Sequence, residues 1–244
     1  MRELLVINPN TSASVSDLLQ GHVQAEAGLH VRVRTVTARF GAPYIADEAS
    51  YAVASHAALD AWAAALAQPG PAPDAVLIGC FGDPGLLALR ESSPAQVTGL
   101  AEAAFIEAAR HGRFAVVTGG TRWAPMLQRL AQALGHAPAL AGIHTVVPTG
   151  AQLAADPAAA RALLAQACRD AVRQLGVQAV ILGGAGLAGM AAGIQPGLGV
   201  PLIDSVLAGA RWALRGHAPP TPRVTAGFDV PWENVSAELA ALGL

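Results

Sequence analysis

Short apolar runs alternate along the chain with longer Ala- and Leu-rich segments of helical spacing. This alternation is typical of βαβ units and predicts an α/β fold with mostly parallel sheets. The predicted strands are Leu4 to Asn8, Val31 to Thr37, Ala75 to Cys80, Phe114 to Thr118, Ala141 to Val146, Ala179 to Gly183 and Pro201 to Ile203. Helices fill the intervals, and the apolar spacing from Trp232 to Leu244 predicts one last helix.

Two pairs of similar segments occur in the same order in the two halves of the chain. Leu5 to Thr11 aligns with Ala115 to Thr121, and Leu77 to Gly85 aligns with Ile181 to Gly189. Two matches at similar offsets favour an internal duplication. We therefore expect two pseudo-symmetric lobes, one made of residues 1–113 together with 206–244 and the other of residues 114–205. Because ligands bind beyond the carboxyl ends of the strands in open α/β sheets, the active site should lie in a cleft between the lobes.

The composition predicts a compact protein, since 53% of the 244 residues are hydrophobic and 13% are charged. The net charge is −2, and Lys and Arg are scattered singly along the chain. The sequence therefore predicts no basic surface patch that would bind nucleic acid or an anionic membrane. The most apolar stretch, Ala179 to Ile194, is too short and glycine-rich for a transmembrane helix, and the first apolar run is too short for a signal-peptide core. We expect a cytoplasmic homo-oligomer.

Two cysteines are too few for a disulfide scaffold and lack the spacing of a metal site. Cys80 ends a predicted strand, and Asp83-Pro84 then predicts a helix start with Asp83 as N-cap. A thiol close to a helix start is favoured as thiolate, the basic and nucleophilic form. The alternative is that Cys80 is only a small buried apolar residue. The glycines on either side of Cys80 and Phe81 leave room for a ligand and favour the functional interpretation.

Cys168 and the glycines after the predicted strand Ala179 to Gly183 have a different explanation. Cys168 lies at helical spacing with Leu164 and Leu175, which predicts a core position. Gly184 to Gly189 fits the dinucleotide-binding pattern G-x-G-x-x-G, and Asp204 follows where a ribose-binding acid would stand. Glycines and a proline interrupt the helix that such a site needs, so nicotinamide binding is disfavoured. The glycines instead predict a loop whose N–H groups hold a ligand oxygen.

Polar residues gather at the end of the first predicted strand. Thr11 or Ser12 is expected to be a helix N-cap, while Asn8 and Asn10 are free to reach the cleft. Asp47 and Glu48 are expected to open a helix, where the helix dipole favours acidic residues.

Four segments carry a more specific signal: Ile7 to Ser12 (INPNTS), Gly79 to Gly85 (GCFGDPG), Arg113 to Thr118 (RFAVVT) and Gly199 to Asp204 (GVPLID). With these segments the chain resembles the Asp/Glu/hydantoin racemase superfamily, and within it the hydantoin and allantoin racemases. The resemblance runs from the first strand to about Ala213. It implies two pseudo-symmetric α/β lobes, no cofactor, no metal, and a small-molecule substrate that is a cyclic ureide or a carboxylate. In that family two cysteines face opposite sides of the acidic carbon, one removing a proton and the other returning one.

The resemblance also implies roles for individual residues. Cys80 stands at the position of the first catalytic cysteine. The residues that match ligand-binding positions of the family are Asn10, Thr118, Thr121, the backbone amides of Phe81 and Ala185, and the adjacent Gly82 and Gly186. Tyr44 and Ile45 match a loop that covers the ring.

The second cysteine of the family falls at Gly184, which has no proton to give. Three functions therefore stay open. In the first, the chain is a hydantoin or allantoin racemase without its second cysteine, as an inactivated or a ligand-trapping variant. Alternatively it is a single-cysteine enzyme like the arylmalonate decarboxylases, or a non-catalytic protein that binds a ureide or carboxylate.

Overall fold

The computed structural model describes residues 1–215 and 227–242 and contains two four-stranded parallel sheets, which confirms the α/β prediction. The first sheet has the order β2-β1-β3-β4 and the second has the order β6-β5-β7-β8. The strands of the first sheet are β1 (Arg2–Asn8), β2 (Val31–Thr37), β3 (Ala75–Ile78) and β4 (Gln96–Gly99). Those of the second sheet are β5 (Phe114–Gly119), β6 (Leu140–Val146), β7 (Ala179–Gly183) and β8 (Leu202–Asp204). The identical order supports the internal duplication.

Helices cover both faces of each sheet. The longer ones are α1 (Ala13–Ala27), α2 (Glu48–Leu66), α4 (Leu100–Ala109), α5 (Trp123–Ala133), α7 (Pro157–Leu175) and α9 (Ser205–Leu214). The shorter ones are α3 (Leu86–Ser92), α6 (Gly150–Ala155), α8 (Met190–Ile194), α10 (Ala237–Ala240) and the 3-10 turns η1 (Ala185–Leu187) and η2 (Gln195–Gly197). None of these helices, within the part of the chain that the structure describes, is long and apolar enough to cross a membrane.

The central strands alternate between two cores. In β1, Leu4 and Val6 point into a central core shared by both sheets, whereas Leu5 and Ile7 point into an outer core under α2 and α3. The strands β3, β5 and β7 divide their side chains in the same way. This follows from the period of two along a strand, and it explains why these strands are apolar at nearly every position.

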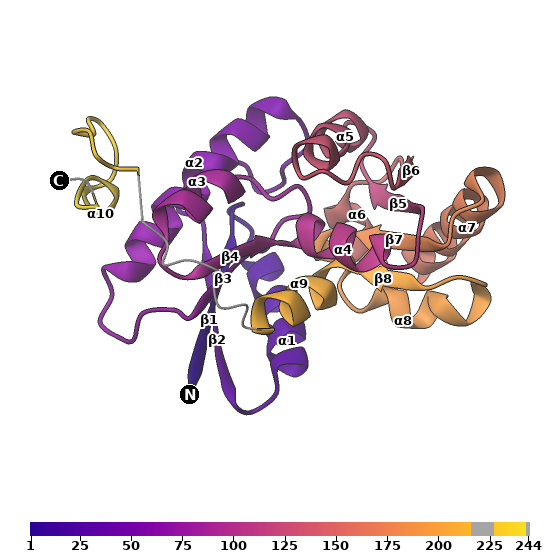
Figure 1. Cartoon of the computed structure of the whole chain (residues 1–244), viewed down its shortest axis with the longest axis horizontal. Coiled ribbons are helices and arrows are strands. Elements are labelled where there is room, and N and C mark those ends of the chain that lie inside the picture. The colour runs from indigo at the N-terminus through magenta and orange to yellow at the C-terminus, as the bar shows by residue number, and fades with distance from the viewer. Residues whose placement is uncertain (216–226, 243–244) are drawn as a thin grey trace.

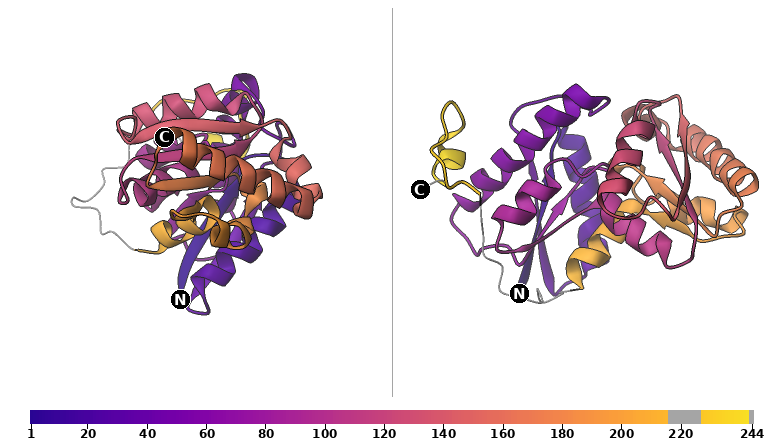
Figure 2. Two further views of the ribbon diagram at one scale, coloured as in Figure 1. Left: turned by 90° about the vertical axis from the view of Figure 1, so that its right-hand side faces the viewer. Right: turned by 45° about the horizontal axis from the view of Figure 1, so that its top comes forward.

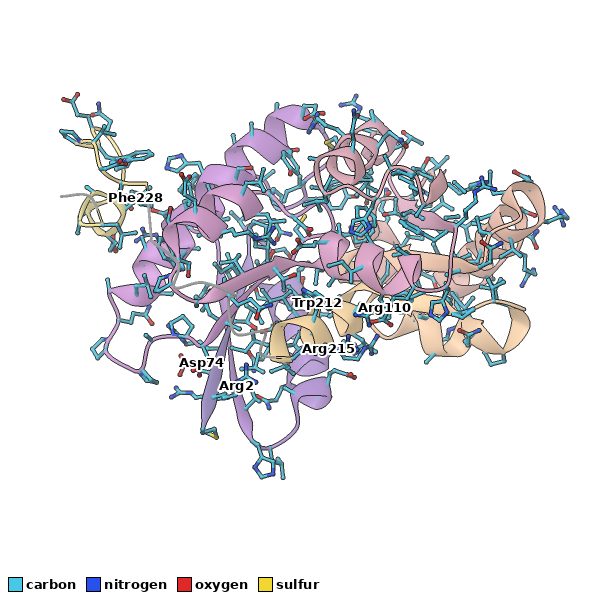
Figure 3. All side chains as sticks on the ribbon, viewed as in Figure 1. Arg2, Asp74, Arg110, Trp212, Arg215 and Phe228 are labelled. Atoms are coloured by element: carbon cyan, nitrogen blue, oxygen red, sulfur yellow. The ribbon has the colours of Figure 1, made fainter. Side chains whose placement is uncertain are left out.

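The helices α4 and α9 lock the two sheets together. Each follows the last strand of its own sheet, and each packs against the other sheet: α4 contacts β7 and β8, and α9 contacts β3 and β4. In Figure 1 they lie between the violet half and the orange half, and Figure 2 shows the same arrangement from two other sides. Figure 3 shows Trp212 of α9 beside Arg110 and Arg215, whose guanidinium groups lie 5.5 and 5.7 Å from the ring centroid. The exact division into lobes stays a prediction.

The strands and helices predicted from the sequence differ from the structure at several places. The strand predicted to reach Cys80 ends at Ile78, so the thiol lies in the loop that follows. The sequence did not predict β4, because a four-residue strand that contains Gln, Thr and Gly has no apolar run. The last predicted helix is reduced to α10, which packs on α2 far from the second sheet (Figure 1), and residues 243–244 lie outside the described part.

Asp83 and Pro84 do not start a helix as predicted, because α3 starts only at Leu86 after a left-handed Gly85. Asp83 itself has a positive φ of 53°, and its carboxylate accepts hydrogen bonds from the backbone N–H groups of Ala101 (2.9 Å) and Glu102 (2.8 Å). It therefore caps α4, whose N-cap residue, Gly99, has no side chain to supply a cap. A Cβ on Gly99 would lie 2.1 Å from the Asp83 carboxyl carbon, so the two residues are mutually dependent.

We expect Gly99→Ala to lower the free energy of unfolding by about 1–3 kcal/mol, because the added methyl group must push the Asp83 carboxylate away from the buried N–H groups of α4. Gly21→Ala in α1 is the matched control, since nothing lies within 4 Å of its Cβ. It should be neutral or stabilise the chain by up to about 1 kcal/mol, as alanine does in an exposed helix. Urea titrations measure both, and equal stability of the two variants would contradict the capping role.

Candidate active site between the two sheets

A cleft of about 430 Å³ lies where the carboxyl ends of the two sheets meet. Most residues predicted to form the site do line it, from loops after β1, β2, β3, β5 and β7. They are Asn10, Tyr44, Ile45, Cys80, Phe81, Thr118, Gly184, Ala185 and Gly186. The structure therefore brings Cys80 and Gly184, which follow equivalent strands of the two sheets, into one cleft.

Gly82 and Thr121 were predicted to contact the ligand, but they do not line the cleft. The carbonyl of Gly82 accepts a hydrogen bond from the Tyr51 hydroxyl (2.8 Å), and the ring of Trp123 packs against its Cα. Thr121 is exposed in the turn before α5. Its repeat partner Thr11 is likewise not among the residues that line the cleft, whereas its neighbour Asn10 is.

One apolar wall of the cleft was not predicted from the sequence. Its residues come from the start of α1, the loop before α2, the start of α5, and α6, and they include Val15, Leu18, Pro43, Trp123, Ala154 and Ala155. The spacing of Val15 and Leu18 on one face of α1 was a signal for contact with something apolar. The short, Ala-rich α6 offered none.

Burial controls the charge of the Cys80 thiol. Cys80 is 7% exposed, and its burial raises the pKa of the thiol above the usual range, with a further contribution from the Asp83 carboxylate. The expected thiolate is therefore wrong for the protein without ligand. The physical reason is that α3 begins only six residues after Cys80, so the helix start that was expected beside the sulfur lies further along the chain and burial dominates.

The carboxyl group of Asp83, three residues after Cys80, is also buried. Burial raises the pKa of Asp83 to about 7, although the N–H groups of Ala101 and Glu102 act in the opposite direction. Burial likewise raises the pKa of Tyr51, and the nearby Asp83 and Cys80 add to this. The surroundings of the thiol thus disfavour negative charge.

Gly184, which lines the same cleft as Cys80, has a backbone conformation that other residues avoid. Its φ is +144° and its ψ is 132°, and its N–H group donates to the buried Ser205 hydroxyl at 3.2 Å. A Cβ there would lie 3.3 Å from the Leu187 side chain. The loop is therefore built around a glycine, and no sulfur stands on this side.

Asn10 is oriented by its neighbours. Its side-chain oxygen accepts from the Asn8 amide (3.1 Å) and from the Ser12 backbone N–H (2.9 Å), so its amide nitrogen is the atom left to donate into the cleft. Ser12 holds the N-cap position of α1, as expected, but its side chain makes no capping bond. Asp47 and Glu48 open α2 as predicted, and Asp47 also caps this helix through the backbone N–H of Ser50 (2.9 Å).

Tyr44 carries the loop after β2 across to the second sheet. Its hydroxyl accepts from the indole N–H of Trp123 (3.3 Å) and the backbone N–H of Gly150 (3.3 Å), and it donates to the Gly119 carbonyl at 3.5 Å. Two ion pairs also connect the start of α2 to the region of α5: Asp47 pairs with Arg122, and Glu48 pairs with Arg129. The loop thus covers one side of the cleft.

The glycine-rich segment after β7 is not a dinucleotide site. Only the 3-10 turns η1 and η2 and the five-residue α8 lie between β7 and β8. Asp204 caps α9 through the N–H groups of Val206 and Leu207 and also accepts from Gly189. Cys168 is fully buried in the core under α7, as predicted. Within residues 1–215 and 227–242, no group of three or more His, Cys, Asp or Glu side chains could hold a metal ion.

Comparison with known proteins places this geometry in a family. Residues 4–213 match the family model for Asp/Glu/hydantoin racemases. The chain belongs to this family. It is 33% identical over 214 residues to a hydantoin racemase from Paenarthrobacter aurescens, covering 86% of this chain and 89% of that protein. A hydantoin racemase from Pseudomonas sp. (strain NS671) is 31% identical over 222 residues, covering 86% of this chain and 84% of that protein.

Solved structures of the family have a similar fold. An allantoin racemase from Klebsiella pneumoniae superimposes with a TM-score of 0.82 at 30% sequence identity, covering 87% of this chain and 86% of that chain. The resemblance derived from the four sequence segments is therefore confirmed at the level of the racemase family.

For this racemase-family chain we expect the stability of the parent relative to Asp83→Asn to decrease as the pH rises. A carboxyl group whose pKa is raised to about 7 on folding stabilises the fold while protonated, and this contribution is lost between its unfolded pKa and pH 7. Between pH 5 and pH 8 the difference in unfolding free energy should fall by about 2–3 kcal/mol. Denaturant titrations at both pH values measure it, and a constant difference would show that Asp83 is ionised throughout.

Gly184→Ala and Gly184→Cys should each lower the free energy of unfolding by about 1–3 kcal/mol, because any Cβ is strained at this positive φ. Gly199→Ala is the control, since its backbone is ordinary and nothing lies within 4 Å of its Cβ. That variant should stay within about 0.5 kcal/mol of the parent. If thermal melts find Gly184→Cys as stable as the parent, the loop tolerates a cysteine without rearrangement.

Proposed function

We propose that the chain catalyses proton transfer at the acidic C5 carbon of a 5-substituted hydantoin, with Cys80 as the group that removes or returns the proton on one face. The observation that carries this proposal is the position of Cys80, the one sulfur among the residues that line the cleft. The kinship with hydantoin racemases supports the reaction type. The proposed chemistry uses no metal or cofactor.

The absence of charge in the cleft favours a neutral substrate. Among the described residues that line it, none is Lys, Arg, Asp or Glu. A dicarboxylate such as aspartate, glutamate or an arylmalonate would lose its hydration there without an opposite charge in return, which is costly. A hydantoin ring brings two carbonyl groups and two N–H groups that neutral hydrogen-bonding partners can satisfy. This argument disfavours the decarboxylase alternative.

The polar groups of the cleft suit such a ring. The Asn10 amide and the Thr118 hydroxyl are proposed to bind ring polar groups, together with the backbone amides of Phe81 and Ala185. Donors aimed at a ring carbonyl stabilise the enolate that forms when C5 loses its proton. Loss of this proton is thereby made easier without any charged side chain.

The apolar wall supports an alkyl or aryl substituent at C5. Val15, Leu18 and Trp123 offer carbon surface, whereas the ureido group of allantoin needs several hydrogen-bonding partners. Among the relatives, the hydantoin racemases therefore provide the better guide to the substrate than the allantoin racemases of similar structure.

We expect Cys80→Ser to reduce deuterium incorporation at C5 by at least about 100-fold for the enantiomer whose C5 hydrogen faces the sulfur, as is typical for loss of a general base. The R and S forms of 5-isobutylhydantoin in deuterated buffer, followed by NMR, provide the measurement. Because burial raises the pKa of the thiol, the exchange rate should keep rising above about pH 10, where a solvated thiol with a pKa of about 8.5 would be almost fully ionised.

Cys168→Ser is the matched control, since this second sulfur lies in the core under α7 and should leave exchange per folded molecule unchanged. If neither enantiomer loses exchange in Cys80→Ser, the role of Cys80 is wrong. If the parent chain binds hydantoins but exchanges neither enantiomer, the chain is a binding protein.

A further inference from the structure

The cleft contains a second side chain that can ionise. Apart from Cys80, the polar side chains among the described lining residues are the amide of Asn10, aliphatic hydroxyl groups, the indole of Trp123, which can only donate, and the phenol of Tyr44. Amides and aliphatic hydroxyls do not exchange protons with a carbon acid near neutral pH, whereas phenols serve as general acids and bases. Tyr44 is therefore the group to examine for the proton that Gly184 cannot supply.

The Tyr44 oxygen lies on the side of the cleft where Gly184 stands. It contacts the Gly119 carbonyl at the end of β5 and the Gly150 N–H group at the start of α6. In the register of β5 and β7, Thr118 pairs with Gly183, so the following residues Gly119 and Gly184 lie at the same edge of the second sheet. The helix α6 also packs against η1, which directly follows Gly184. Cys80, in contrast, follows β3 of the first sheet.

The Tyr44 hydroxyl lies among hydrogen-bonding groups of the second sheet. Two N–H donors, the indole of Trp123 and the backbone of Gly150, point at the phenol oxygen, and both strengthen when that oxygen becomes negative. The proton itself points to the Gly119 carbonyl at 3.5 Å, the longest of the three contacts, so little is lost when it moves to a substrate.

We propose that Tyr44 is the second catalytic acid-base residue, acting on the face of C5 opposite to Cys80, so that the chain inverts its substrate without a second cysteine. This inference rests on the function proposed above. The Cys80 thiolate takes the C5 proton, and the electron pair of the C–H bond moves into the ring as an enolate. The Tyr44 O–H bond then breaks, its proton forms the new C–H bond on the other face, and a phenolate remains. The reverse direction starts from the phenolate and the thiol.

Tyr44→Phe tests this proposal, because it keeps the ring and removes only the hydroxyl. With each enantiomer of 5-isobutylhydantoin in deuterated buffer, the parent should deuterate and invert both. Tyr44→Phe should deuterate only the enantiomer that faces Cys80, with retention of configuration, and its inversion rate should fall at least about 100-fold. A purely structural role of Tyr44 would instead lower exchange and inversion together.

Tyr51→Phe is the matched control. Tyr51, the other tyrosine of the chain, holds the Cys80 loop through the Gly82 carbonyl, so its loss should lower exchange and inversion by the same factor. Trp123→Phe removes one donor to the phenol oxygen and should reduce inversion more than exchange, which provides a second test if Tyr44→Phe does not fold.

The outcomes distinguish a failure of the proposed role of Tyr44 from a failure of the proposed function. Exchange of one enantiomer by the parent with no inversion would overturn the role of Tyr44 and leave that of Cys80 intact. Inversion by Tyr44→Phe at the parental rate would do the same. If the parent exchanges neither enantiomer, the proposed function fails, and the role of Tyr44 fails with it.

Discussion

The packing of α4 and α9 across the sheets is the constraint on which the rest of the structure depends. Each of these helices belongs to one sheet in sequence and to the other in space, so the two sheets share one central core. Because the helices fix how the carboxyl ends of the sheets face each other, they also fix the distance across the cleft. Asp83 connects this framework to the chemistry, since it lies three residues after Cys80 and caps α4.

Low polarity around the sulfur has two opposing effects. It raises the pKa of the thiol, because a buried thiolate has no positive partner among the described lining residues. In the proposed reaction, the same surroundings strengthen every hydrogen bond to a developing enolate once water has been displaced. The proposed function therefore depends on a carbon acid that is already activated by its own carbonyl groups, as C5 of a hydantoin ring is.

The sequence predicted the class of fold, most strands and most of the cleft, because these depend on local signals. Apolar runs at the right spacing revealed β1, β3, β5 and β7, and the string from Gly79 to Gly85 located Cys80. The sequence could not reveal that Asp83 caps α4, since the contact joins residues 18 positions apart. The charge of Cys80 was predicted wrongly for a similar reason, because burial by distant elements outweighs the local pattern. The positions of Tyr44 and Trp123 relative to each other also depend on tertiary packing alone.

Asp83 and Asp204 show how the two copies have diverged. In the first sheet the acid that caps the helix after the fourth strand comes from the loop after the third strand, whereas in the second sheet it comes from the N-cap position of that helix and binds back to the loop at Gly189. The carboxylate has the same capping role in both sheets, while its place in the sequence differs. Groups with the same role in the two halves therefore need not stand at aligned positions of the sequence. The same principle would allow an acid-base group lost from one loop to be supplied by another.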